Sequence, residues 1–203
     1  MNRAFAILAL GALAACTHHV DVELRPDYPT GVKESVLTSV RPAVSFARGG
    51  YADKRGDTTM LATFKQGVHT YNLFGQRPAS DALFEGVQIL VERAGHTWVP
   101  GDSGQVRIDL QLLGMEANRN AGLFEVGASS KVQMKLDFVD RATGRLIYSD
   151  VYNGADQRSK ALIGGMGMVK ASLDGSIINC INQVGADSRL VDALRQWVQA
   201  PRP

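Results

Sequence analysis

The sequence predicts an α+β domain, in which a mostly antiparallel sheet has helices packed on one face. Residues 106–112 and 131–138 alternate strictly between apolar and polar side chains. This period of two is typical of strands with one covered and one solvated face, and it favours antiparallel pairing. Residues 80–94 and 168–184 instead repeat apolar residues at steps of three and four. Each of these stretches predicts an amphipathic helix that lies on the sheet.

Residues 1–15 predict a secretory signal peptide. Arg3 gives the start one positive charge, and residues 4–13 contain only Ala, Phe, Ile, Leu and Gly. A charged start, a short apolar run and small residues before a cut are typical of such signals, and the run is too short to span a bilayer. We therefore expect this segment to be removed from the mature protein.

The end of this segment, Leu13-Ala14-Ala15-Cys16, resembles the lipobox of bacterial lipoproteins. The resemblance implies cleavage before Cys16, a diacylglycerol on its sulfur and acylation of the new amine. Two or more acyl chains hold a protein firmly to a membrane. The alternative is an ordinary signal peptide with a coincidental cysteine. We expect no cofactor other than this covalent lipid.

Residues 16–42 are predicted to be an extended tether that carries the lipid. Proline removes backbone donors and keeps the chain extended, so a semi-stiff spacer is expected. The prolines concerned are Pro26, Pro29 and Pro42. Alternation at Val20, Val22 and Leu24 could add one edge strand. His18 and His19 have no third ligand beside them, so no metal site is predicted.

A single α+β domain is expected over residues 43–200. Its first strand covers residues 43–52 and ends in a turn at 53–57. Residues 58–79 show no lasting period; pieces of strand covering a sheet edge would be one explanation, and their role stays unassigned. The first helix has Ser80 as a candidate N-cap and Gly95 as a left-handed C-cap.

The second half of the domain is predicted from its alternation and its turns. A short strand at 96–99 precedes the two alternating strands; between these, residues 114–130 either extend a hairpin or form a mobile tip. A turn at 140–144 leads to a strand at 146–152. In the helix over 168–184 we expect Cys180 to be a buried small hydrophobe. Asp187 or Ser188 should cap a third helix.

Composition excludes several functions. Lys and Arg number 22 against 20 Asp and Glu, for a net charge of +2, so no nucleic-acid partner is expected. Only two cysteines are present, and with Cys16 acylated Cys180 has no disulfide partner. Beyond residue 16, no apolar stretch approaches the length of a membrane span. The acyl chains are therefore the expected membrane contact of the mature protein.

No motif marks a catalytic centre, so no catalytic residue is predicted. The sequence lacks G-x-S-x-G, H-E-x-x-H, a Walker A loop and C-x-x-C. A Ser-His-Asp set built on His69 or His96 is the enzyme alternative, because triads assemble from distant positions.

The polar pair that we single out is Asp53-x-Arg55, which we expect to fix a surface turn through a local ion pair.

The order of these features resembles the YajG-type family of bacterial envelope lipoproteins over residues 16–198. The features are the lipobox, the proline-bearing tether, Asp53-x-Arg55 at a strand end, a helix that closes at Ala94-Gly95 and a glycine-led C-terminal helix. The resemblance implies a fold similar to the amino-terminal domain of TolB and to transport-auxiliary lipoproteins. Residues 58–79 depart from the family pattern as an insertion.

These predictions favour a periplasm-facing lipoprotein that acts as a non-enzymatic adaptor or assembly factor through an unidentified envelope protein. The candidate contact surfaces are the sheet edge and the 114–130 hairpin. The alternative is an auxiliary of lipid or lipopolysaccharide transport, which would need an apolar groove between sheet and helices. Thr17 follows the lipidated residue where enteric inner-membrane lipoproteins carry Asp, so the resemblance favours the outer membrane.

Overall fold

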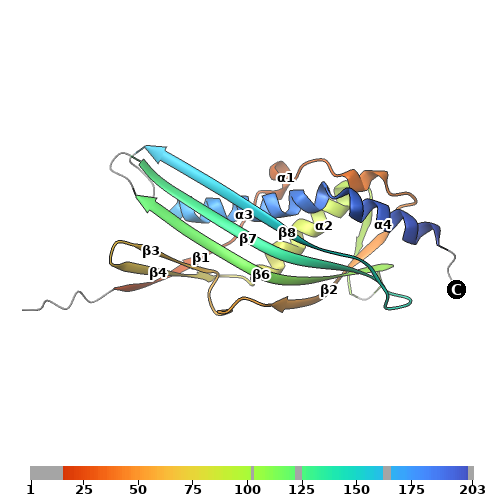
Figure 1. Ribbon diagram of the computed structural model, residues 1–203, viewed down its shortest axis with the longest axis horizontal. Coiled ribbons are helices and arrows are strands. Elements are labelled where there is room, and N and C mark those ends of the chain that lie inside the picture. The colour runs from red at the N-terminus through yellow and green to blue at the C-terminus, as the bar shows by residue number, and fades with distance from the viewer. Residues whose placement is uncertain (1–15, 102, 122–124, 162–165, 201–203) are drawn as a thin grey trace, which may run out of the picture.

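The computed structural model describes residues 16–101, 103–121, 125–161 and 166–200, which form an elongated α+β structure (Figure 1). The strands are β1 (Thr17–Val22), β2 (Ser45–Asp53), β3 (Ala62–Gln66), β4 (His69–Gly75), β5 (Thr97–Val99), β6 (Val106–Ala121), β7 (Glu125–Asp140) and β8 (Leu146–Ala161). The helices are α1 (Tyr28–Gly31), the 3-10 turn η1 (Val36–Ser39), α2 (Ala79–Arg93), α3 (Met166–Gly185) and α4 (Ser188–Gln199). In these ranges no helix has the length and apolar character needed to cross a bilayer.

The strands form two sheets. The large sheet has the order β5-β2-β6-β7-β8, and the small sheet has the order β1-β4-β3. The α+β class is as predicted, but antiparallel pairing dominates only part of the structure. Strand β2 runs parallel to both β5 and β6, and β1 runs parallel to β4. Parallel neighbours need a crossover, and α2 lies in the connection from β2 to β5.

The long strands β6, β7 and β8 bury one face under the helices. Ile108, Leu110, Leu136 and Phe138 point to this side and are almost fully buried, as their alternation predicts. Helix α3 packs against β7 and β8. A Cβ added to Gly154 of β8 would lie 1.9 Å from the carbonyl oxygen of Ser176, so only glycine permits this close approach.

The predicted tether over residues 16–42 is wrong, because the structure packs this segment into the core. Leu24, Tyr28, Leu37 and Val40 are buried in the same cluster as the sheet and helix residues. The Tyr28 hydroxyl donates a hydrogen bond to the Ala82 carbonyl of α2. These side chains are buried one at a time between different elements. Their spacing along the sequence therefore shows no helical or strand period. Pro29 lies in the first turn of α1, which contacts α2 and α3.

The edge strand suggested by Val20 and Val22 is present as β1. It pairs with β4, and the unassigned residues 58–79 supply both β3 and β4. The inner face of the small sheet buries Val22, Phe64 and Leu73. Residues 58–79 therefore contain strands, as suggested, but these strands form a second sheet with β1.

Several element ends differ from prediction. Strands β6 and β7 each extend to 16 residues, so the glycine-bearing region lengthens the hairpin; residues 122–124 lie outside the described ranges. Helix α2 has Pro78 at its N-cap position rather than Ser80, without a side-chain cap, whereas Gly95 has the expected positive φ of 81°.

Cys180 is buried as predicted, and burial raises the pKa of its thiol to about 12.

Candidate functional site

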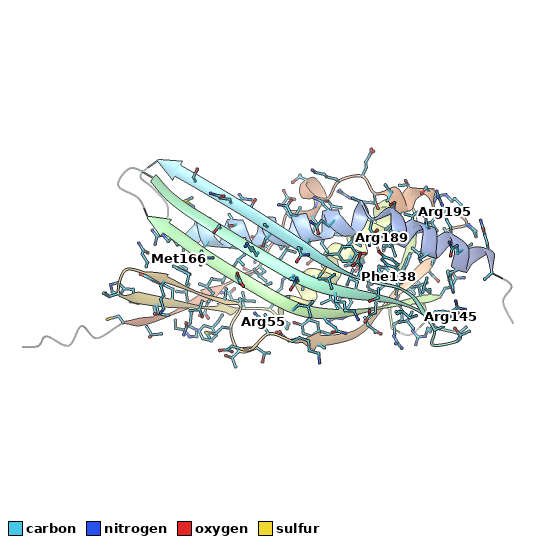
Figure 2. All side chains as sticks on the ribbon, in the orientation of Figure 1. Arg55, Phe138, Arg145, Met166, Arg189 and Arg195 are labelled. Carbon is cyan, nitrogen blue, oxygen red and sulfur yellow. The ribbon has the colours of Figure 1, made fainter. Side chains whose placement is uncertain are left out.

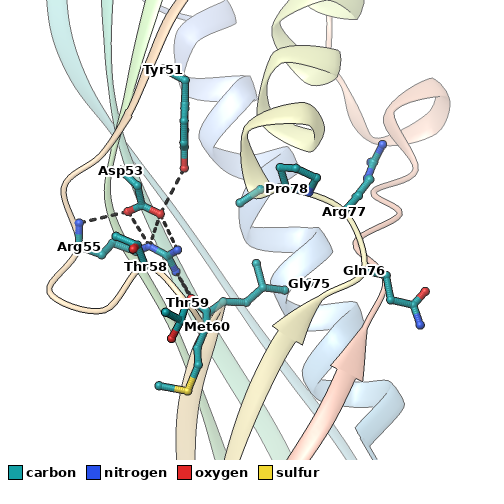
Figure 3. Close-up of a pocket in the computed structure, with 12 residues that line it drawn as sticks. Tyr51, Asp53, Arg55, Thr58, Thr59, Met60, Gly75, Gln76, Arg77 and Pro78 are labelled. Atoms are coloured by element: carbon teal, nitrogen blue, oxygen red, sulfur yellow. Dashed lines mark hydrogen bonds and ion pairs between the residues drawn. The ribbon is translucent and has the colours of Figure 1, made fainter.

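The candidate site is a cavity of about 380 Å³ where the two sheets meet (Figure 3). The end of β2, the loop 54–61, the end of β4 and the start of α2 form its walls. The lining residues are Tyr51, Asp53, Arg55, Thr58, Thr59, Met60, Leu61, Gly75, Gln76, Arg77, Pro78 and Ala79. The Asp53-x-Arg55 pair singled out from the sequence thus lies in the wall of a cavity.

Arg55 connects the two sheets through its guanidinium group. Its Nε donates to Asp53 Oδ1 at 2.9 Å and its Nη2 to Asp53 Oδ2 at 2.6 Å. Its Nη1 donates to the carbonyl oxygens of Met60 and Leu61, both at 2.7 Å. The planar guanidinium thereby holds a carboxylate at the end of β2 and two carbonyls just before β3.

The expected ion pair is present, but it is not the exposed surface pair that the sequence suggested. The side chains of Arg55 and Asp53 are only 9% and 15% exposed. The sequence could not reveal this burial, because it depends on the path of the loop 54–61, which brings the carbonyls of Met60 and Leu61 to the guanidinium. The pair therefore acts as an internal cross-link of the fold.

The electrostatics of the cavity keep Asp53 ionised and Tyr51 neutral at neutral pH. Burial alone would raise the pKa of Asp53, but the hydrogen bonds and charge of Arg55 outweigh it and hold this pKa below its ordinary value. Burial, followed by the charge of Asp53, raises the pKa of Tyr51 to about 12. At neutral pH the Tyr51 hydroxyl stays protonated and donates to Asp53 at 3.4 Å.

Tyr51 is the cavity residue that the sequence reasoning missed. It precedes Asp53 by two positions in β2, so the alternation of a strand places both on one side. In Figure 3 the side chains of Gln76 and Arg77 point away from the Asp53–Arg55 pair. Arg77 donates instead to the Leu24 carbonyl at 3.0 Å and to Glu85 at 2.8 Å.

The two histidines of the enzyme alternative have different surroundings. His96 is buried, its Nδ1 accepts from the Val44 amide at 3.3 Å, and its Nε2 donates to the Leu37 carbonyl at 3.1 Å. Burial lowers the pKa of His96; the hydrogen bond to Leu37 opposes this shift, and the charge of Arg41 adds to it. His69 Nδ1 is hydrogen-bonded to His18 Nε2 at 2.9 Å in the small sheet.

A second polar cluster, which the sequence did not indicate, fixes α4 to β8. Asp187 accepts from the hydroxyls of Tyr148 at 2.7 Å and Tyr152 at 3.0 Å. Its other oxygen caps α4 by accepting from the amides of Arg189 and Leu190, as the sequence predicted for either Asp187 or Ser188. Burial alone would raise the pKa of Asp187, but these hydrogen bonds lower it. The cluster therefore serves as a joint between two elements.

The sheet edge predicted as a contact surface is partly covered. Strand β8 is the last strand of the large sheet, yet its Asn153 amide donates to the side chain of Gln183 at 2.8 Å. The Ala155 carbonyl accepts from the side chain of Asn179, also at 2.8 Å. Side chains of α3 thus occupy backbone groups that an added strand would need.

Cys16, the predicted lipidation residue, is exposed and directly precedes β1. Its carbonyl oxygen accepts from the Thr70 amide at 2.9 Å. The predicted cleavage residues Leu13, Ala14 and Ala15 lie outside the described ranges. Within those ranges, no three side chains of His, Cys, Asp or Glu gather into a metal-binding group.

Comparisons with known proteins relate this chain to solved structures by fold. A Xanthomonas campestris protein assigned to the DUF330 family has a TM-score of 0.59 at 9% identity, covering 89% of this chain and 99% of that one. At this identity the similarity is one of fold alone.

Two solved lipoproteins give lower scores, which carry no argument. A minor lipoprotein from Acinetobacter baumannii has a TM-score of 0.38 at 11% identity, covering 80% of this chain and all of that one. Lipoprotein GNA1162 from Neisseria meningitidis has a TM-score of 0.37 at 9% identity, covering 64% and 92%. No family model and no curated protein matches the sequence.

The cross-link role of Arg55 predicts that even Arg55→Lys is destabilising. A lysine cannot hold the Asp53 carboxylate with two parallel bonds and reach two carbonyls as well, so the free energy of unfolding should fall by about 1–3 kcal/mol. Urea denaturation of the purified domain measures this change. Arg158→Lys is the matched control, because Arg158 contacts Asp156 at the same spacing but is 47% exposed. An equal loss in both variants would contradict the assignment.

The buried, neutral His96 predicts a stability that depends on pH. The unfolded chain binds a proton at His96 near pH 6.5, whereas the folded protein binds it only at lower pH. The free energy of unfolding should therefore fall as the pH drops from about 7.5 to 5. In His96→Gln this dependence should be shallower than in the wild type. Identical pH profiles for wild type and His96→Gln would exclude the assignment.

Proposed function

We propose that this protein is a lipid-anchored component of the bacterial cell envelope that acts through contacts with other envelope molecules. The observation that carries the proposal is the sequence Leu13-Ala14-Ala15-Cys16 placed directly before the first strand of the folded domain. A signal of this form delivers a chain across the inner membrane, and acylation at Cys16 holds it there. YajG-type membership and an outer-membrane location facing the periplasm, favoured by Thr17, belong to the same proposal.

The way in which the fold uses its polar clusters supports a non-catalytic role. Arg55 is bonded to a carboxylate and two carbonyls, and both ring nitrogens of His96 are bonded to backbone groups. Asp187 caps a helix and holds two tyrosines. Each of these three groups, which could otherwise act as an acid, a base or a charge stabiliser, is engaged in holding two parts of the fold together.

The packing favours an adaptor over a lipid-transport auxiliary. Transport of an acyl chain would require an apolar groove between sheet and helices. That space is instead filled by one continuous cluster of buried side chains from both sheets and from all four α-helices. The cavity of about 380 Å³ at Asp53 and Arg55 does not supply such a groove, because its walls come from β2, the loop 54–61, β4 and α2 and include no residue of α3 or α4.

The experiment combines lipid labelling with crosslinking in intact cells. Wild-type protein should incorporate labelled palmitate, fractionate with membranes and form a discrete crosslinked species with an envelope protein. Cys16→Ser should lose the label and the membrane association, because the acyl chains are the proposed anchor. Cys180→Ser, which changes the buried cysteine, is the matched control and should keep both.

Two results would overturn the proposal. A wild-type protein that stays unlabelled with residues 1–15 attached would remove the anchor. A labelled protein that crosslinks to nothing beyond itself would remove the adaptor role.

A further inference from the structure

The junction between the proposed lipid and the folded domain has no spacer. Cys16 is followed at once by Thr17, which pairs with Thr70 of β4, and the Cys16 carbonyl itself accepts from the Thr70 amide at 2.9 Å. Adjacent Cα atoms lie about 3.8 Å apart, whereas residues 17–42 as an extended tether would reach roughly 90 Å. An acyl-bearing Cys16 therefore cannot leave the small sheet unless β1 detaches.

Strand β1 is held on both of its faces. On the inner side, the rings of His18, Tyr71 and Phe64 stack in a row across the three strands, with centroids 4.8 Å and 4.9 Å apart. On the outer side, His19 stacks on Phe74 at 3.9 Å. Val22 is buried further along the strand. These contacts add to six backbone pairs with β4 and make detachment of β1 costly.

The register of this pairing decides which part of the surface lies beside the lipid. Because β1 and β4 are parallel, Cys16 lies at the end of the small sheet where β4 begins. The turn between β3 and β4 therefore extends past Cys16, with Gly67 at a positive φ of 59° and Val68 50% exposed. Figure 1 shows the small sheet toward one end of the long axis and the C-terminus at the other.

The chemistry of this turn suits the boundary of a lipid layer. Val68 is one of few large apolar side chains exposed on the described surface. Lys65 is also exposed, one residue before Gln66 ends β3. A cation near the phosphate layer and an apolar side chain toward the acyl region form a favourable interfacial pair. Tyr71 follows this turn in β4, and tyrosine side chains are enriched at membrane interfaces.

We infer that the turn 66–69 docks into the headgroup layer of the membrane that holds the acyl chains. The small sheet is then the part of the domain that lies nearest the bilayer. This inference rests on the proposed lipidation of Cys16. It sets the orientation of the whole domain. The turn between β7 and β8, which carries Arg145, and helix α4 then lie farthest from the bilayer, where Figure 2 labels Arg145 and Arg195 away from the small sheet.

Depth-dependent fluorescence quenching tests the orientation. Acylated protein carrying Val68→Cys or Arg145→Cys is labelled with a thiol-reactive fluorophore and reconstituted in vesicles of phosphatidylethanolamine and phosphatidylglycerol. Cys180 stays unlabelled in the native state, because it is buried and its thiol pKa is raised. Lipids with a headgroup spin label should remove most of the emission at Val68 and little at Arg145.

A linker variant provides the matched control. A Gly/Ser linker of about 20 residues between Cys16 and Thr17 has a mean length of roughly 25 Å and frees the domain from the surface. It should keep flotation with vesicles but lose the quenching at Val68. Flotation with equal quenching at Val68 and Arg145 would overturn the orientation and leave the anchor intact. Failure of the unmodified protein to float would overturn the anchor and the orientation together.

Discussion

The pairing of β1 with β4 directly after Cys16 is the constraint on which the rest of the account depends. Without β1 the small sheet would be a two-stranded hairpin that depends entirely on its packing against the rest of the fold. With β1 in place, the proposed anchor is continuous with a sheet whose inner face belongs to the common core. Attachment to a membrane would then fix the direction of the domain as well as its distance. A partner would then always meet the same side of the domain, because the domain could not rotate freely about its anchor.

Three polar clusters of the described structure lie at joints between elements. Arg55 joins the end of β2 to the start of β3, and so the large sheet to the small one. Asp187 joins α4 to β8, and His96 joins η1 to the start of β2. Such half-buried polar groups are stable only when all their hydrogen bonds are made. Each group therefore fixes one specific arrangement of the two elements that it joins. The structural roles of these groups explain why they are partly buried and why the pKa values of Asp53, Asp187 and His96 are shifted.

The sequence predicted those features that depend on local periodicity. The alternation over 106–112 and 131–138 located β6 and β7, and the stripe through Leu83 and Val87 located α2, because each pattern reflects one buried face. The tether was wrong because Leu24, Tyr28 and Leu37 are buried one at a time against distant helices, which leaves no period. The parallel pairings were missed because the period of a strand shows which face is buried but not which strand lies beside it; β2 pairs in parallel with both β5 and β6. At the candidate site, Asp53 and Arg55 were found by their spacing, but their burial depends on residues brought together by the fold.

Hydrogen exchange at the Thr70 amide, measured by NMR on the acylated protein, tests the central constraint most directly. This amide donates to the carbonyl of Cys16. It should be protected to the same degree as the β4 amides that pair with β3, because β1 and β4 then open only together with the sheet. Exchange at the rate of an unfolded chain, at Thr70 and throughout residues 17–22, would mean that the segment is a free tether after all, and the fixed orientation would be excluded.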